Sequence, residues 1–187
     1  MNSLKSGISR SGPILVLAML CAGPAGRYSN GGLAMDLTLK SPAFVHEGFI
    51  PKKHTCDGAD VSPALQWSGP PAGTVSLSHT MDDPDAPGRT WVHWVLYRIP
   101  AQARELPEGL LGELALKDGS RQGRNDFSRP GYGGPCPPKG APHRYFFKLY
   151  ALDSAPDLPP GARKADLEKA MEGHILAQTQ LMGRYQR

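Results

Sequence analysis

Residues 81–99 read MDDPDAPGRTWVHWVLYRI, and this stretch decides the fold. Proline fixes its own φ and pushes the residue before it toward extended geometry, so residues 83–87 are predicted to form a stiff, extended loop. The run at residues 91–97 is rich in aromatic and β-branched side chains and therefore predicts a strand. Strand alternation places Trp94 on an apolar core face and His93 on the opposite face, toward the loop.

A second unit of the same kind lies at residues 131–153, which read GYGGPCPPKGAPHRYFFKLYALD. Its Gly/Pro-rich loop leads into a predicted strand at residues 143–152. Alternation puts His143 and Tyr145 on one face of that strand and Arg144 on the other. Each unit therefore has a proline-stiffened loop followed by a strand with a histidine near its start.

The rest of the chain predicts a mostly β fold with one helical region. Further strands are expected at residues 35–40, 64–67 and 74–81, where apolar and polar residues alternate. Apolar residues at near-helical spacing predict a helix within residues 162–185. Strands at regular spacing with one late helix indicate a β-sandwich of two antiparallel sheets with Greek-key connections and a C-terminal helical segment.

Four motifs stand in order along the two loop-and-strand units: DPDAP (83–87), HWV (93–95), GPCPPKG (134–140) and HRY (143–145). They resemble the phosphatidylethanolamine-binding protein family, in its bacterial branch that is often called Raf kinase inhibitor-like. The resemblance covers residues 35–187. It implies the same sandwich of two antiparallel sheets, and a small surface pocket that binds anions and phospholipid headgroups. It also implies that the protein needs no cofactor.

Length and charge fit one domain preceded by a leader. Residues 1–34 begin with a basic segment that holds Lys5 and Arg10, followed by a short apolar run at 13–22 and small residues, which is typical of a signal peptide; Arg27 is the third basic residue of this leader. The domain is then 35–187, in the periplasm or secreted; if Met35 is the true start, the protein is cytoplasmic. Loss of the leader would lower the net charge from +4 to +1, which argues against nucleic-acid binding. The domain has no basic amphipathic helix, so stable membrane insertion is not predicted.

Cysteine usage leaves two alternatives open. Cys21 falls in the leader, and Cys56 and Cys136 lie in separate Gly/Pro-rich loops without the spacing of a zinc site. The two loop cysteines are either separate thiols or, if the protein is exported and the loops meet, a disulfide.

The candidate ligand-binding residues come from the two loop-and-strand units. They are Asp83, Asp85, His93, Gly134, Pro135, His143 and Tyr145. Histidine and tyrosine can donate to an anion, and backbone N–H groups at Gly133 and Gly134 can form an anion-binding nest. The aspartates either orient the histidines or accept a hydrogen bond from the ammonium group of a zwitterion such as phosphoethanolamine.

Three functions remain open from sequence. The favoured one is a non-catalytic protein that binds a small anionic or zwitterionic ligand, with no metal site. The Asp/His cluster alternatively suits a metal-dependent or acid–base hydrolase, although no metal-ligand spacing or GxSxG motif is present. The third is inhibition of a kinase or protease through surface binding, which the resemblance implies.

Overall fold

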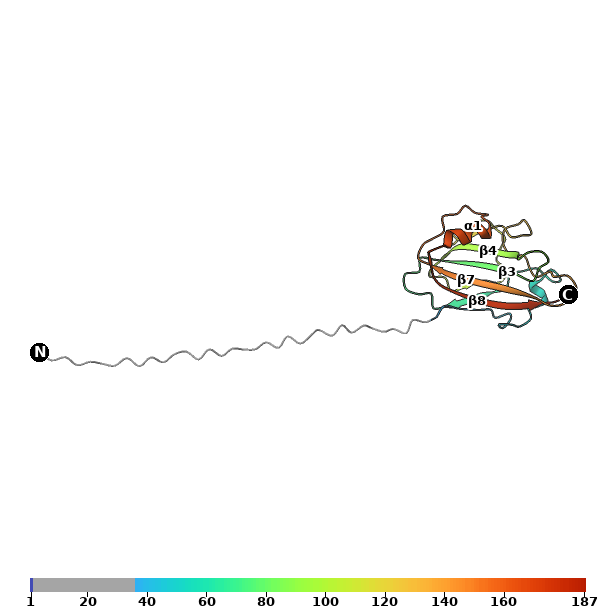
Figure 1. Cartoon of the computed structure of the whole chain (residues 1–187), viewed down its shortest axis with the longest axis horizontal. Helices are drawn as coiled ribbons and strands as arrows, with labels where there is room; N and C mark the ends of the chain where they lie inside the picture. Colours follow the sequence, from blue (N-terminus) through green and yellow to red (C-terminus); the bar gives the residue numbers. More distant parts are fainter. Residues whose placement is uncertain (2–35) are drawn as a thin grey trace. The chain divides into compact units, whose positions relative to one another are not determined.

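The structure is a computed structural model that describes Met1 and residues 36–187 (Figure 1). The expected leader, with Cys21, lies outside the described residues. Among the described residues, no helix is long and apolar enough to cross a membrane.

Two antiparallel sheets make up the fold. The larger has the order β6-β4-β3-β7-β8, in which β3 (Ser76–Asp83) lies between β4 (Trp91–Pro100) and β7 (His143–Leu152), as Figure 1 shows. Its outer strands are β6 (Arg121–Gln122) and β8 (Ile175–Tyr185). The smaller sheet has the order β1-β2-β5, with bounds Thr38–Lys40, Leu65–Ser68 and Glu105–Leu106. A short 3-10 helix, η1 (Lys52–His54), precedes β2, and α1 (Lys164–Met171) precedes β8.

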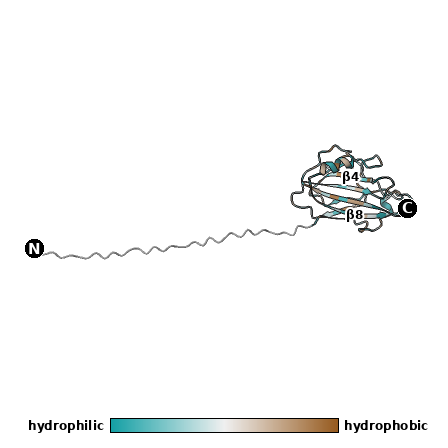
Figure 2. Ribbon diagram, viewed as in Figure 1, coloured by the Kyte–Doolittle hydropathy of each residue, from teal (hydrophilic) through white to brown (hydrophobic). Residues whose placement is uncertain are grey.

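The central strand of the larger sheet, β3, is buried along its whole length, whereas most of the outer strand β8 is exposed or half-buried. Hydrophobic clusters lie on both faces of the sheet, and hydrophobic stretches follow its strands (Figure 2). One face packs against the smaller sheet, and this main core includes Leu39, Trp67 and Trp94. The other face packs against α1, where Leu167 contributes to a second cluster with Tyr97. The expected class, two antiparallel sheets with a helix near the C-terminus, is confirmed.

The predicted alternation along β4 is wrong at His93. Trp94 pairs with Met81 and Val92 pairs with Asp82, so His93 is an extra residue with no partner on β3. Such a β-bulge resets the alternation of the strand. His93 therefore contacts the ring of Tyr145, a residue of the main core to which Trp94 also belongs. The expected separation of His93 from the core face does not occur.

The predicted helix at residues 162–185 is also wrong over its second half. Helix α1 ends at Met171, and Gly173 then adopts a positive φ of 77°. Residues 175–185 pair with the full length of β7 as β8. Near-helical spacing of apolar residues continued across this boundary by coincidence, because Ile175 is exposed on the strand rather than buried.

Candidate functional site

Three strand ends meet at one place in the larger sheet. Asp83 is the last residue of β3, whereas His143 is the first residue of β7 and Trp91 is the first of β4. Because β3 runs antiparallel to both neighbours, its end lies beside both of their starts. The two loop-and-strand units of the sequence are thus brought together by the central strand.

A pocket with a volume of about 240 Å³ opens at this place. Its lining comprises Asp83, Ala86, Pro87, Trp91, His93, Phe127, Cys136, Pro137, Pro138 and His143. Three of the residues expected from sequence, Asp83, His93 and His143, line this pocket. The expected loop at 83–87 contributes to its wall, although it forms turns rather than extended chain.

Asp83 holds His143 in place. Its Oδ2 lies 2.8 Å from Nδ1 of His143, and only 5% of the Asp83 side chain and 13% of the His143 side chain are exposed. The other carboxylate oxygen accepts the backbone N–H of Asp85 at 2.9 Å. Both Asp83 oxygens are therefore engaged within the protein, and Asp83 fixes the orientation of His143 and leaves the histidine Nε2 for a ligand.

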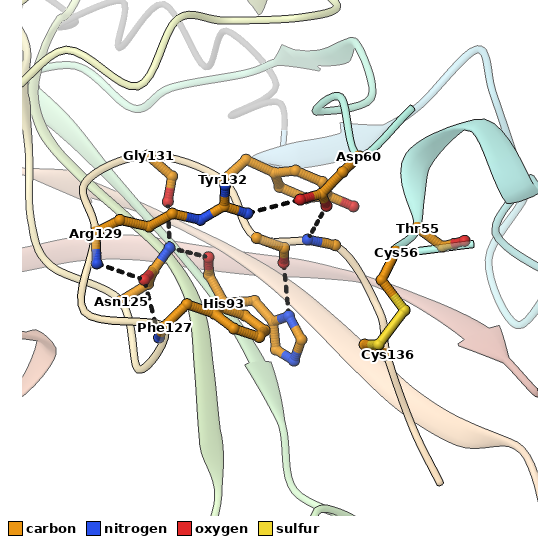
Figure 3. A network of polar contacts seen from close by, with 12 residues as sticks. Thr55, Cys56, Asp60, His93, Asn125, Phe127, Arg129, Gly131, Tyr132 and Cys136 are labelled. Carbon is orange, nitrogen blue, oxygen red and sulfur yellow. Dashed lines mark hydrogen bonds and ion pairs between the residues drawn. A yellow bond between two sulfur atoms is a disulfide. The ribbon is translucent and has the colours of Figure 1, made fainter. Parts of the chain in front are cut away.

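Burial favours the neutral form of the His93 imidazole. Burial lowers its pKa, because the imidazolium would lose its hydration. Its Nδ1–H donates to the carbonyl oxygen of Gly133 at 2.6 Å, a contact that Figure 3 shows. Nε2 is then an acceptor, and it has no hydrogen-bond partner among the described residues. The rings of Phe127 and Tyr145 flank the imidazole at 5.3 and 5.2 Å.

Tyr145 supports the pocket without lining it. Its side chain is buried in the main core, edge-on to His93. Burial raises the pKa of its hydroxyl, and the negative charge of Asp83 raises it further. The expected role of Tyr145 as a donor at the pocket surface is replaced in this geometry by packing behind His93.

Asp85 lies outside the pocket lining. Its carboxylate accepts the Nε–H and an Nη–H of Arg144 at 2.9 and 2.7 Å, and the backbone N–H of Arg144 at 2.9 Å. These hydrogen bonds lower the pKa of Asp85 to about 2. Asp85 therefore ties the loop after β3 to the start of β7.

Gly134 and Pro135 also lie outside the lining, and the expected backbone nest is not available. The N–H of Gly133 donates to the carbonyl of His93 at 3.0 Å, and the N–H of Gly134 donates to Asp60 at 2.6 Å. A Cβ on Gly134 would lie 2.5 Å from the same Asp60 oxygen, so this approach requires glycine. The two glycines anchor the pocket wall rather than offer donors to a ligand.

A disulfide joins Cys56 to Cys136 with a Cα–Cα distance of 5.4 Å (Figure 3). Of the two alternatives left open by sequence, the structure has the bonded one. Cys136 and the prolines that follow it line the pocket. The bridge thus ties this wall to the loop after η1, where Asp60 also forms an ion pair with Arg129 at 2.6 Å.

Sequence reasoning missed the apolar part of the site. Trp91, Phe127 and the prolines Pro87, Pro137 and Pro138 form most of the wall. Trp91 had a usable signal, because it opens the strand that carries His93. Phe127 had no such signal, because it lies 34 residues after His93 in the sequence. It reaches the pocket through a loop held by Asn125, whose side-chain oxygen accepts the backbone N–H of Phe127 (Figure 3).

Metal-ligand chemistry has no ready site here. Within residues 36–187, no group of three or more His, Cys, Asp or Glu side chains is placed to hold a metal ion.

Comparison with known proteins identifies the relatives of this chain. Residues 40–186 match the family described as phosphatidylethanolamine-binding protein. A UPF0098 protein of Methanothermobacter thermautotrophicus is 50% identical over 151 residues, which cover 81% of this chain and 99% of that protein. The UPF0098 protein YbhB of Escherichia coli is 46% identical over 124 residues, or 65% of this chain and 78% of that protein.

Two solved structures have the same fold. A phosphatidylethanolamine-binding protein homologue from Chlamydia trachomatis gives a TM-score of 0.75 at 38% identity, over 81% of this chain and 98% of that one. YbcL of E. coli, described as a member of the mammalian family of these proteins, gives 0.76 at 34% identity, over 82% of this chain and 99% of that one.

Proposed function

Because the chain belongs to the phosphatidylethanolamine-binding protein family, we propose that its pocket binds a small anionic or zwitterionic phosphate compound, such as a phosphoethanolamine headgroup, without transforming it. The observation that carries this proposal is the Asp83–His143 pair in a preformed pocket of about 240 Å³. A volume of this size suits a headgroup rather than a whole lipid.

The phosphate end of the ligand would lie against His143. With Nδ1 committed to Asp83, a proton on Nε2 makes this ring a charge-assisted donor to a phosphate oxygen. Asp83 repels the phosphate less strongly in this arrangement, because both of its oxygens are engaged in hydrogen bonds, one with the His143 ring and one with the backbone N–H of Asp85.

The ammonium end would lie among the aromatic side chains. Trp91 and Phe127 line the pocket with their rings 5.5 Å apart, and aromatic faces attract cations. A zwitterion uses both ends of the site, so it should bind more tightly than inorganic phosphate.

A hydrolase that uses the same pocket is the alternative. The lining contains no serine or threonine, and its one cysteine is bonded to Cys56, so no hydroxyl or thiol nucleophile lines the pocket. Hydrolysis would then require Asp83 and His143 to activate a water molecule directly. Binding without turnover is the simpler use of these groups.

We place the protein in the periplasm or outside the cell, because disulfides persist in oxidising compartments. There the protein would bind a kinase or protease as an inhibitor, and this binding would depend on whether the pocket holds a ligand. The exposed side chains of Pro87, Phe127 and Pro138 at the pocket are the surface that such a partner would contact.

Titration calorimetry with O-phosphoethanolamine tests the proposal, using His143→Ala and a matched control. His174 forms a similar pair with Asp153 at 2.8 Å outside the pocket, so His174→Ala removes the same chemistry elsewhere. We expect His143→Ala to weaken binding about tenfold or more, in line with loss of a charged hydrogen bond, and His174→Ala to have no effect. Equal affinities for both variants would refute the pocket, and release of inorganic phosphate by the wild type would favour the hydrolase.

A further inference from the structure

A second, larger cavity lies behind one wall of the pocket. It has a volume of about 740 Å³. Its lining is Arg89, Val92, Arg124, Asn125, Asp126, Ser128, Arg163, Lys164 and Ala165. Four of these nine residues are cationic and one is acidic. We name this cavity the arginine groove.

Two arginines that are distant in sequence lie side by side in the groove. Arg124 and Arg163 form a parallel β-bridge, and the backbone N–H of Arg124 donates to the carbonyl of Ala162 at 3.1 Å. The Arg124 guanidinium makes one contact, a hydrogen bond of 3.3 Å to the Ser128 carbonyl. Within residues 36–187, no carboxylate oxygen lies within 4.0 Å of either guanidinium.

The other charges of the groove are already compensated. Asp126 Oδ2 accepts an N–H of Arg89 at 2.8 Å and the backbone N–H of Val92 at 2.7 Å. Nζ of Lys164 lies 3.2 Å from Oδ2 of Asp82 and 2.9 Å from Oε1 of Glu168. Asp166 also lies beside Arg163, since its Oδ2 accepts the backbone N–H of Arg163 at 3.0 Å. Among the charged side chains that line the groove, Arg124 and Arg163 are thus the ones whose guanidinium groups have no carboxylate within 4.0 Å among residues 36–187.

We propose that the arginine groove is a binding site for a small phosphate-bearing anion, separate from the headgroup pocket. Guanidinium presents two parallel N–H donors that match the oxygens of a phosphate group. Arg124 and Arg163 supply two such forks, and a bound anion also removes their mutual repulsion. The volume of 740 Å³ admits a ligand larger than one phosphate group.

The groove and the headgroup pocket are built on the same two segments. In residues 89–92, Trp91 lines the pocket whereas Val92 lines the groove; in residues 125–128, Phe127 lines the pocket whereas Asp126 lines the groove. No lining residue is shared between the two cavities. Occupancy of the groove is therefore testable independently of the headgroup proposal.

Backbone amide NMR of the full chain, titrated with inorganic pyrophosphate, tests the groove. We expect saturating shifts at Arg124, Ser128 and Lys164. Arg124→Gln combined with Arg163→Gln should weaken this binding about tenfold or more, because both forks are lost. The Arg→Lys pair keeps the charge but loses the forks, so it should weaken binding less than the glutamine pair does.

Two controls make the result decisive. Lys40→Gln with Lys117→Gln removes the same charge from exposed positions outside the groove and should leave the affinity unchanged within about twofold. His143→Ala should also retain the shifts at the groove. The proposal is overturned if shifts appear only around the headgroup pocket or if they do not saturate. It is also overturned if the variant with Arg124→Gln and Arg163→Gln loses no more affinity than the variant with Lys40→Gln and Lys117→Gln.

Discussion

The Cys56–Cys136 bridge should account for a large share of the stability of the domain. We consider the double substitution Cys56→Ser and Cys136→Ser, which removes the bridge without leaving either of its two cysteines as a free thiol. The two residues are 80 positions apart, so the bridge closes more than half of residues 36–187 into one loop. For a loop of this length, the chain-entropy relation gives a stabilisation of about 4 kcal/mol at 25 °C.

That loss is large relative to the whole. Domains of this size are stable by about 5–15 kcal/mol, so the variant should remain folded but with a much smaller margin. Guanidinium unfolding followed by circular dichroism should show the midpoint lowered by about 1 M and the slope increased, because the unfolded chain without the bridge is less compact and exposes more surface. The melting temperature should fall by about 8–16 °C.

A reducing agent provides the matched control. Reduction should lower the midpoint of the wild type toward that of the double variant and leave the variant itself unchanged. A loss below about 1 kcal/mol would refute the reasoning, because the bridge would then not restrict the unfolded chain. The same variant should bind O-phosphoethanolamine more weakly, because Cys136 and the prolines after it would lose their covalent link to the loop after η1.

Two further predictions concern buried and paired charges. Burial lowers the pKa of His79 from 6.5 to about 3. Below pH 6.5, His79 therefore binds a proton in the unfolded chain but not in the folded protein. The His79 contribution to the free energy of unfolding should be complete above pH 6.5 and fall toward pH 3 by up to ~1.4 kcal/mol per pH unit. His79→Phe should lessen this pH dependence in denaturant titrations. An identical pH dependence in the variant would show that His79 is not its cause. Asp85→Ala should cost about 1 kcal/mol by loss of the Arg144 pair, yet leave O-phosphoethanolamine affinity unchanged. A tenfold loss of affinity in that variant would return Asp85 to the site.

Sequence reasoning was most successful where a strand is long and its pattern is unbroken. The strand predicted at 143–152 coincides with β7, and the predicted shared face of Tyr145, Phe147 and Leu149 lies in the main core. Tyr145 therefore packs in the core rather than reaching the pocket as expected. Sequence reasoning failed at β8, where a helix was predicted. An 11-residue edge strand with mixed polarity carries a weak period, and pairing with β7 decided its conformation.

The candidate site shows the same division. Asp83, His93 and His143 follow from sequence because each lies where a proline-bearing loop meets a strand. Asp85 and Gly134 belong to the same family motifs, but Arg144 and Asp60 engage them instead. Sequence distance does not reveal which of several neighbouring polar groups will find a partner within the protein.

The family, the mostly β class and the two loop-and-strand units could be predicted without the structure, because they depend on local pattern and on motifs. Tertiary structure decided what those units became. Pairing of β3 with both β4 and β7 brought Asp83 to His143, and a bulge turned His93 toward Tyr145. A bridge contact set Arg124 beside Arg163. Such juxtapositions arise from strand register and chain crossing, which are fixed only when the whole core packs together.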